Sequence, residues 1–341
     1  MPESTNEPSS FSIGPTLSPV VLLIGVLLIQ LGFTASYVGA FHSPTPHKVP
    51  IAVAPPAGAP DQPARELART LNGLDDKPLK ATVVKDEAEG RRKLKDRSVG
   101  AVLVIGEQGY QLLVASADGS SLSEAVEKVV KGVAAEQRLP VETSDVIPAG
   151  KGDDLGLSAF YLAVGWVVGG YLAASILGIT EGERLPTMRR LGIRLARIVV
   201  YSVLSGLGGA WIVGPWLNAL DHGFWPLAAF GTLLVLGVTV FTLGCEAWLG
   251  VLGIGVAIVL FVVLGNPSAG GAFPTNLLPP FFSAIGPWLP PGAGTSAIRG
   301  IVYFDDAGVR GPVLVMVAWL VLGLVLLVVP TLRQQRARVE A

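Results

Sequence analysis

The sequence predicts an α-helical polytopic membrane protein with six transmembrane helices and an α/β domain inserted between the first two. Of its 341 residues, 50% are hydrophobic and only 15% are charged, a balance too apolar for an ordinary soluble protein. Apolar runs of about 20 residues, the length that crosses a hydrocarbon core, recur along the chain. One long polar block, residues 42–155, separates the first run from the others. With a net charge of −1 and no basic stripe, we expect no nucleic-acid partner.

The first apolar run, residues 18–41, is long enough to be a transmembrane helix. Residues 1–17 before it are rich in Pro, Ser, Thr and Glu and are expected to form a disordered tail. A cleaved signal peptide is the alternative, because Val38-Gly39-Ala40 has the small residues of a cleavage site. The tail has no Lys or Arg for a basic n-region, and this favours an uncleaved helix.

The block 42–155 is predicted to be an α/β domain followed by a linker. Strands are expected at 49–54, 79–84, 99–105 and 111–115, where short apolar runs are bounded by turn residues. Helices are expected at 64–71 and 86–97 from their periodicity and their i, i+4 charge pairs. A third helix follows Ser121, which forms a capping box with Glu124. The predicted order is βαβαββα, and residues 138–155, rich in Pro, Gly and Asp, are predicted to be a linker.

Residues 156–330 are predicted to be a five-helix transmembrane region. Its expected spans are 157–179, 195–217, 224–245, 248–264 and 312–329. The span at 248–264 is at the lower limit of the length that can cross a bilayer. Gly165 and Gly169 form a GxxxG pair, so they are the candidate residues for close helix packing.

The segment 266–304, before the last span, is apolar but rich in proline. Prolines from Pro267 to Pro291 prevent a continuous helix, because each removes a backbone donor and clashes with the preceding turn. Irregular backbone at membrane depth persists only where protein or water satisfies its polar groups. We therefore expect two short helices, 281–285 and 296–304, laid across the outer end of the bundle, with Thr295 as the N-cap of the second.

Basic residues near the ends of the spans predict the orientation, because short cytoplasmic loops are enriched in Lys and Arg. Two clusters follow the second and the last span: Arg184, Arg189, Arg190, Arg194 and Arg197, then Arg333, Arg336 and Arg338. Both termini, including the tail 331–341, are therefore expected in the cytoplasm. The α/β domain and the segment 266–304 are expected outside the cell membrane.

Motifs for chemistry are absent from the sequence. The only Gly-Lys pair, Gly150-Lys151, is followed by Gly152 and so is not a phosphate-binding loop. No spacing of His, Cys, Asp or Glu suggests a metal site, so we expect neither enzyme activity nor a cofactor. Among ionisable residues, only Glu246 lies near the interior of a span, at an end from which it can reach the interface. A bundle without buried charges favours lipophilic or amphiphilic cargo over ion-coupled antiport.

The whole chain resembles the membrane subunits of type-2 ATP-binding-cassette (ABC) exporters, in particular the phage-infection-protein-like and actinobacterial permease branch. The order of one span, a domain carrying IAVAPPAG and SVGAVLVIGEQGYQLLVA, and five further spans is similar to that of the family. The stretch GNPSAGGAFPTNLLPPFFSAIGPWLPPGAGTSAIRGIVYF looks like the family's loop between the last two spans. The tail before Ser18 lacks the amphipathic connector helix that many such exporters carry.

The resemblance implies a permease that pairs with a second copy or a paralogue and with a separate cytoplasmic ABC ATPase subunit. The residues that would contact the ATPase are Glu181, Glu183, Arg184, Arg189 and Arg190. The candidate outer gate consists of Pro279, Pro280, Phe281, Phe282, Pro287, Trp288, Pro290 and Arg299. The arginines have a second interpretation, since they also serve to set the topology.

We therefore expect the permease subunit of an exporter that moves a lipophilic or amphiphilic substrate outward. The alternative is a membrane-anchored receptor or cell-envelope scaffold, whose external α/β domain binds a partner and which transports nothing.

Overall fold

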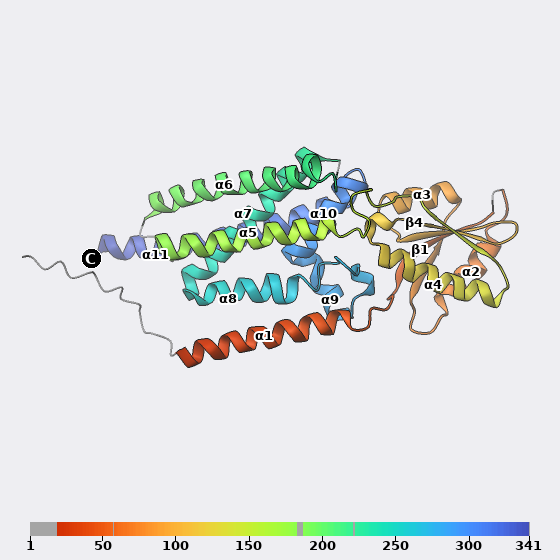
Figure 1. Ribbon diagram of the computed structural model, residues 1–341, viewed down its shortest axis with the longest axis horizontal. Helices are drawn as coiled ribbons and strands as arrows, with labels where there is room; N and C mark the ends of the chain where they lie inside the picture. Colours follow the sequence, from red (N-terminus) through yellow and green to blue (C-terminus); the bar gives the residue numbers. More distant parts are fainter. Residues whose placement is uncertain (1–18, 57, 183–186, 221, 341) are drawn as a thin grey trace, which may run out of the picture.

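The computed structural model describes residues 19–56, 58–182, 187–220 and 222–340, and it places a helical bundle beside a five-stranded α/β unit (Figure 1). In the described residues, five helices are long and apolar enough to cross a membrane. They are Leu23–Phe41, Ser158–Glu181, Met188–Trp216, Phe224–Leu249 and Arg310–Arg336. The fold is that of a multi-pass membrane protein.

Helix α7 (Phe224–Leu249) is the centre of the bundle and packs against α5 (Ser158–Glu181), α6 (Met188–Trp211) and α11 (Arg310–Glu340). In the apolar 18-residue stretch of α7, 78% of the residues are buried inside the protein, whereas the share is 17% in α11 and 11% in α1 (Pro19–Phe41). Glycine allows α11 to pack this closely against α7, because a Cβ on Gly323 of α11 would lie only 2.5 Å from the backbone nitrogen of Phe241. The helices α1 and α11 thus present apolar side chains outward, as lipid-facing helices do.

The unit that we call the α/β domain, residues 49–145, has the sheet order β2-β1-β3-β4-β5. Its strands are β1 (Val49–Ala54), β2 (Leu79–Val83), β3 (Ala101–Ile105), β4 (Tyr110–Val114) and β5 (Val141–Asp145). All neighbouring strands are parallel except β3 and β4, which form the expected hairpin. Helices α2 (Gln62–Asn72) and α4 (Ser120–Glu136) pack on one face of the sheet, and α3 (Glu87–Lys95) packs on the other.

Strand β5 lies in residues 138–155, so the prediction that this whole stretch is a linker outside the α/β domain was wrong. The strand reads Val-Glu-Thr-Ser-Asp and none of its residues is buried, so it carries no apolar alternation. It forms the edge of the sheet through a parallel ladder with β4. Backbone pairing rather than side-chain burial defines this strand, and a hydrophobicity pattern does not detect that.

The predicted count of six spans is not reproduced, because the span at 248–264 is too short. It is a helix of two parts, α8 (Leu252–Ile258) and the π-helical η3 (Val259–Gly265). At 1.5 Å per residue it reaches about 21 Å, against the ~30 Å of a hydrocarbon core. The described start of α1 and the C-terminal end of α11 nevertheless both lie at the end of the bundle away from the α/β domain (Figure 1).

The segment 266–304 forms η4 (Thr275–Leu277), α9 (Pro280–Ile285), η5 (Gly286–Trp288) and α10 (Pro290–Tyr303). The first expected short helix is confirmed as α9. The second begins at Pro290 instead of Ser296, because a helix accepts proline in its first turn, where the missing N–H has no partner to lose. Thr295 is therefore not an N-cap; it lies inside α10 and its hydroxyl donates to the carbonyl oxygen of Pro291 at 2.8 Å.

Helix α10 does not lie across the end of the bundle as predicted. Nearly all of it is buried, and it packs against α5 and α7. A Cβ on Gly294 would lie 2.9 Å from the Cβ of Ala163 and 2.8 Å from Leu234. The backbone of α10 is thus enclosed by protein, which is the condition for a re-entrant segment.

The expectation that the bundle contains no buried charge was wrong, whereas the packing of Gly165 and Gly169 against another helix stays a prediction. Close helix approach occurs at Gly170 of α5, where a Cβ would lie 2.9 Å from Val238, whereas a Cβ on Gly165 meets nothing within 4 Å and one on Gly169 meets only the Tyr201 hydroxyl. The bundle also contains buried charges: Arg194 is fully buried, and Glu246, which packs against Gly178, is 2% exposed.

Candidate functional site

The segment 266–304 is built into the α/β domain as well as into the bundle. Leu277 belongs to the hydrophobic core formed by β1, β3, α2 and α4. The backbone N–H of His47 donates to the carbonyl oxygen of Asn276 at 2.9 Å. Gly119 has φ +134° and lies so close to Pro274 that a Cβ would be 2.4 Å from the proline ring, so only glycine fits there. The domain and the segment are one packed structure.

Ser121 takes part in this junction instead of forming the predicted capping box. Its hydroxyl donates to the carbonyl oxygen of Ala272 at 2.8 Å. The N-cap of α4 is Gly119, which has no side chain to make a cap. The Ser121 hydroxyl therefore bonds a distant segment of the chain instead of the first turn of its own helix.

Arg97, in the turn between α3 and β3, joins the domain to α10. Its Nη1 donates to the carbonyl oxygen of Ser296 at 2.8 Å, and its Nη2 forms an ion pair with Asp118 at 2.7 Å. Its guanidinium also lies 5.2 Å from the centroid of the Phe304 ring, a cation–π distance. One side chain thus contacts both another part of the α/β domain, at Asp118, and the helix α10 with its C-cap, at Ser296 and Phe304.

Arg299 of α10 is 4% exposed and holds the loop at the start of the segment 266–304. Its Nη1 donates to Gly270 O at 2.8 Å, and its Nη2 donates to Gly156 O at 3.2 Å and Gly271 O at 3.1 Å. These acceptors are neutral carbonyls, and Arg299 forms no ion pair within the described residues. A buried guanidinium without a direct carboxylate partner is costly, and here the charges of Asp118 and Asp153, which lie close but form no ion pair with it, only partly offset that cost.

Asp153 anchors the connection that leads into α5. Its Oδ1 accepts from the backbone N–H of Ser158 at 2.8 Å, and its Oδ2 accepts from the Tyr303 hydroxyl at 3.0 Å. Burial, and then the charge of Asp153, raise the pKa of Tyr303 above its ordinary value. The phenol therefore stays protonated and remains a donor to the carboxylate.

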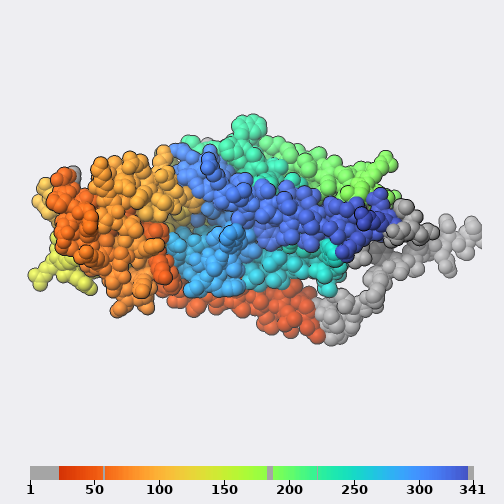
Figure 2. Space-filling view, turned by 180° about the vertical axis from the view of Figure 1, so that it is seen from behind, coloured from red at the N-terminus to blue at the C-terminus, as the bar shows by residue number. Residues whose placement is uncertain are grey.

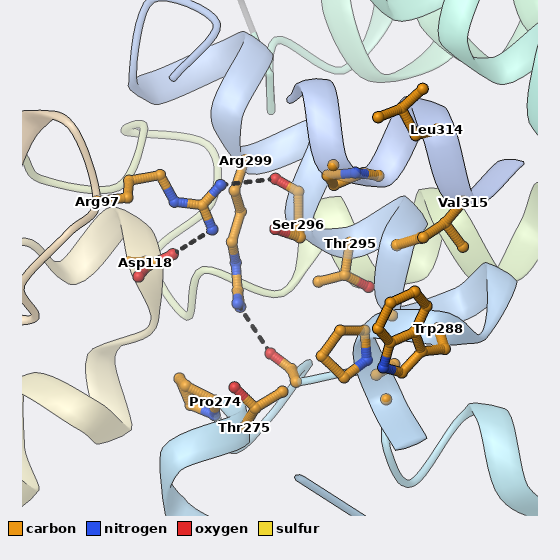
Figure 3. A pocket seen from close by; sticks show the side chains of 18 of the residues that line it. Arg97, Asp118, Pro274, Thr275, Trp288, Thr295, Ser296, Arg299, Leu314 and Val315 are labelled. Carbon is orange, nitrogen blue, oxygen red and sulfur yellow. Dashed lines mark hydrogen bonds and ion pairs between the residues drawn. The ribbon is translucent and has the colours of Figure 1, made fainter. Parts of the chain in front are cut away.

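A cavity of about 630 Å³ lies where the domain, the segment 266–304 and α11 meet. Figure 3 shows Arg97, Asp118, Ser296 and Arg299 together on one side of it and Trp288, Leu314 and Val315 on another. From behind, the segment lies between the α/β domain, α1 and α11, as the light-blue surface in Figure 2. The volume is within the ~300–1,000 Å³ usual for small-molecule sites, and the lining is mostly apolar.

The candidate outer-gate residues separate into three groups. Pro287, Trp288 and Arg299 line the cavity. Pro280 and Phe281 are exposed and Pro279 and Phe282 half-buried, and none of the four lines it. Pro290 is buried at the start of α10. Arg97, Asp118 and Asp153 were missed, because each occurs in a polar stretch whose sequence resembles an ordinary solvated surface, and Tyr303 was missed although the predicted helix 296–304 contains it.

The candidate ATPase-contact residues lie at the opposite end of the bundle. Glu181 is the last residue of α5 and pairs with buried Arg194, at 3.0 Å, and with Arg197. Arg189 and Arg190 are exposed in the first turn of α6, where Thr187 is the N-cap. Glu183 and Arg184 lie outside the described residues. The structure therefore places Glu181 in an internal ion-pair network and leaves Arg189 and Arg190 accessible.

No group of three or more His, Cys, Asp or Glu side chains that could hold a metal ion occurs in the described residues. A scan against protein-family models, a search of curated proteins and a search of solved structures each found no match.

Proposed function

We propose that this chain is the permease subunit of an ABC exporter, which moves a lipophilic or amphiphilic substrate outward and is energised by a separate ATPase subunit. The proposal rests first on the resemblance of chain order and of the segment 266–304. The observation that favours it in the structure is the pair of exposed arginines, Arg189 and Arg190, at the end of the bundle away from the α/β domain.

The positive charges of these two arginines are unfavourable for α6, because they lie at its N-terminus, the positive end of the helix dipole. The first turn of α6 contains no acidic residue, and a cation at a helix N-terminus is unfavourable by about 0.3–1 kcal/mol. Their charge therefore serves something other than the stability of α6. An acidic partner surface and the cytoplasmic orientation both account for it, and the two explanations are compatible.

The arrangement of the segment 266–304 also favours transport. It joins the α/β domain to the bundle through Arg97 and through the core residue Leu277. A movement of α5, α7 or α11 driven from the far end would reach the domain through α10, which packs against all three. In this proposal the domain is extracytoplasmic and the segment closes the outer exit.

Co-purification with an ATPase subunit from native membranes, followed by ATP hydrolysis by the purified complex, tests the function. We expect Arg189→Glu with Arg190→Glu to abolish the association and Arg189→Lys with Arg190→Lys to retain it. Arg69→Glu, on the exposed surface of α2, is the matched charge reversal and should change nothing. A chain that purifies without any ATP-hydrolysing partner contradicts the proposal.

The double charge reversal could abolish association with the ATPase either by inverting the membrane topology or by removing a direct contact, and a labelling experiment separates the two. Cys245 is the single cysteine and is buried, so Cys245→Ala provides a background for labelling. A cysteine at exposed Glu107, between β3 and β4, should react with an impermeant reagent from outside intact cells, both with the natural arginines and in the double reversal. If the cysteine at position 107 is labelled from outside with the natural arginines but not in the double reversal, the arginines set the topology and the contact with the ATPase is unsupported.

The receptor alternative needs the α/β domain to bind its partner alone. Leu277, which lies outside residues 49–145 in the sequence, completes the core of that domain. A test of this alternative therefore uses the full chain, with transport and partner binding measured on the same preparation.

A further inference from the structure

The cavity beneath the α/β domain combines a positive end with an apolar wall. Arg97, Asp118 and Arg299 lie at one end, and the α11 residues Leu314, Ala318 and Leu322 form part of the wall. Two guanidinium groups and one carboxylate give the lining residues a formal net charge of +1, and the carboxylate of Asp153, outside the lining, also acts on Arg299. From this polarity we propose that the cavity binds an amphiphile with one anionic head group and an aliphatic tail, taken from the bilayer.

The wall identifies the tail as hydrocarbon. Leu314, Ala318 and Leu322 are exposed on α11, whose surface faces lipid along most of its length. The indole N–H of Trp319 already donates to the carbonyl oxygen of Trp288 at 2.8 Å. Both indoles line the cavity, and with this donor satisfied the Trp319 ring offers an apolar surface. The cavity is therefore continuous with the lipid-facing side of α11, and a chain can enter it from the side.

The other end identifies the head group as an anion. Arg97 already shares its charge with Asp118, but Arg299 contacts only neutral carbonyls. Within the described residues, the Nε atoms of both arginines are buried without a hydrogen-bond partner. In a low-dielectric site, an anion nearby offsets the cost of this charge without touching the guanidinium.

Polar groups that can hydrogen-bond a head group line the same end. They are the hydroxyls of Thr275 and Ser296 and the amide of Asn276, all half-buried. A carboxylate or phosphate oxygen is an acceptor for all three, whereas a cationic head group would be repelled by the net charge. This assignment does not require transport and holds whether the amphiphile is cargo or a resident lipid.

Binding of brominated fatty acid to the purified full chain in a neutral detergent tests the proposal, with tryptophan quenching as the signal. Trp288 and Trp319 line the cavity, so we expect quenching that is reduced in the double variant Trp288→Phe with Trp319→Phe. A brominated alkyl maltoside of equal chain length should bind at least tenfold more weakly. Equal affinity of the neutral and the anionic probe overturns the proposal.

Two variants on one helix locate the site. Ala318→Trp fills the apolar part of the cavity and should weaken binding at least tenfold. Val321→Trp, which is exposed on α11 outside the cavity, should leave it unchanged. Equal effects of the two substitutions contradict a site in the cavity.

The charge is tested by Asp118→Asn, which raises the net charge of the lining from +1 to +2. We expect it to tighten binding of the anionic probe severalfold and to leave the neutral probe unaffected. Alkyl phosphate and inorganic phosphate separate an amphiphile from a free anion: the first should compete with the fatty acid and the second should not. The assignment is overturned if inorganic phosphate competes with the fatty acid and alkyl phosphate does not. It is also overturned if the fatty acid no longer binds once the chain dimerises.

Discussion

The guanidinium of Arg97 donates to the backbone oxygen of Ser296 at 2.8 Å, across 199 residues of sequence. Arg97 follows α3 of the α/β domain, and Ser296 is in the middle of α10, inside the bundle. This bond, with the Asp118 ion pair and the Phe304 ring, fixes the domain on the bundle.

Replacing Arg97 by Gln should loosen the domain from the bundle. A hydrogen bond to a charged group contributes about 1.5–3 kcal/mol, and the substitution removes two such contacts. We expect a lower thermal unfolding midpoint and faster proteolysis of the connections at 145–157. Lys95→Gln is the control, because its ion pair with Asp305 is exposed and such pairs contribute little to stability. Equal effects of the two variants would mean that Arg97 does not join the two parts.

Replacing Arg299 by Lys should destabilise the segment 266–304 although the charge is kept. An ammonium group cannot reproduce the fork that reaches Gly270, Gly271 and Gly156. Each buried carbonyl left without a donor costs about 1–3 kcal/mol. Hydrogen exchange of residues 266–275 should therefore rise in Arg299→Lys, and unchanged protection would show that lysine suffices.

Alanine scanning of two glycines in α5 should separate close packing from a mere sequence motif. Gly170→Ala pushes a methyl group into Val238 and should cost about 1–3 kcal/mol, as overpacking does. Gly165→Ala has open space around its new methyl group and should leave the unfolding midpoint unchanged. If Gly165→Ala instead weakens self-association measured by crosslinking, Gly165 packs against a second copy, as the paired-permease proposal allows.

Asp153 and Tyr303 should be energetically coupled. Tyr303→Phe removes one hydrogen bond and should cost about 0.5–1.5 kcal/mol, and Asp153→Asn should cost more because it also weakens the acceptor for Ser158. The double variant should lose less stability than the sum of the single variants, as expected for side chains in direct contact. Additive losses would contradict a direct bond.

The sequence by itself determined which segments leave water. The long apolar runs predicted six spans, five of which are helices long and apolar enough to cross a membrane, and local periodicity and charge pairs identified β1 to β4 and α2 to α4. Proline content correctly excluded a continuous helix in the segment 266–304, because the constraint acts within one turn of the chain.

Only the tertiary structure decided what those segments touch. Strand β5 exists through backbone pairing with β4, α10 is buried because it packs against α5, α7 and α11, and Ser121 bonds Ala272 rather than its own helix. Arg97 and Arg299 find their acceptors far away in the chain. A one-dimensional pattern reports the burial that a residue prefers, whereas the identity of its neighbour depends on packing that is settled only when distant segments meet.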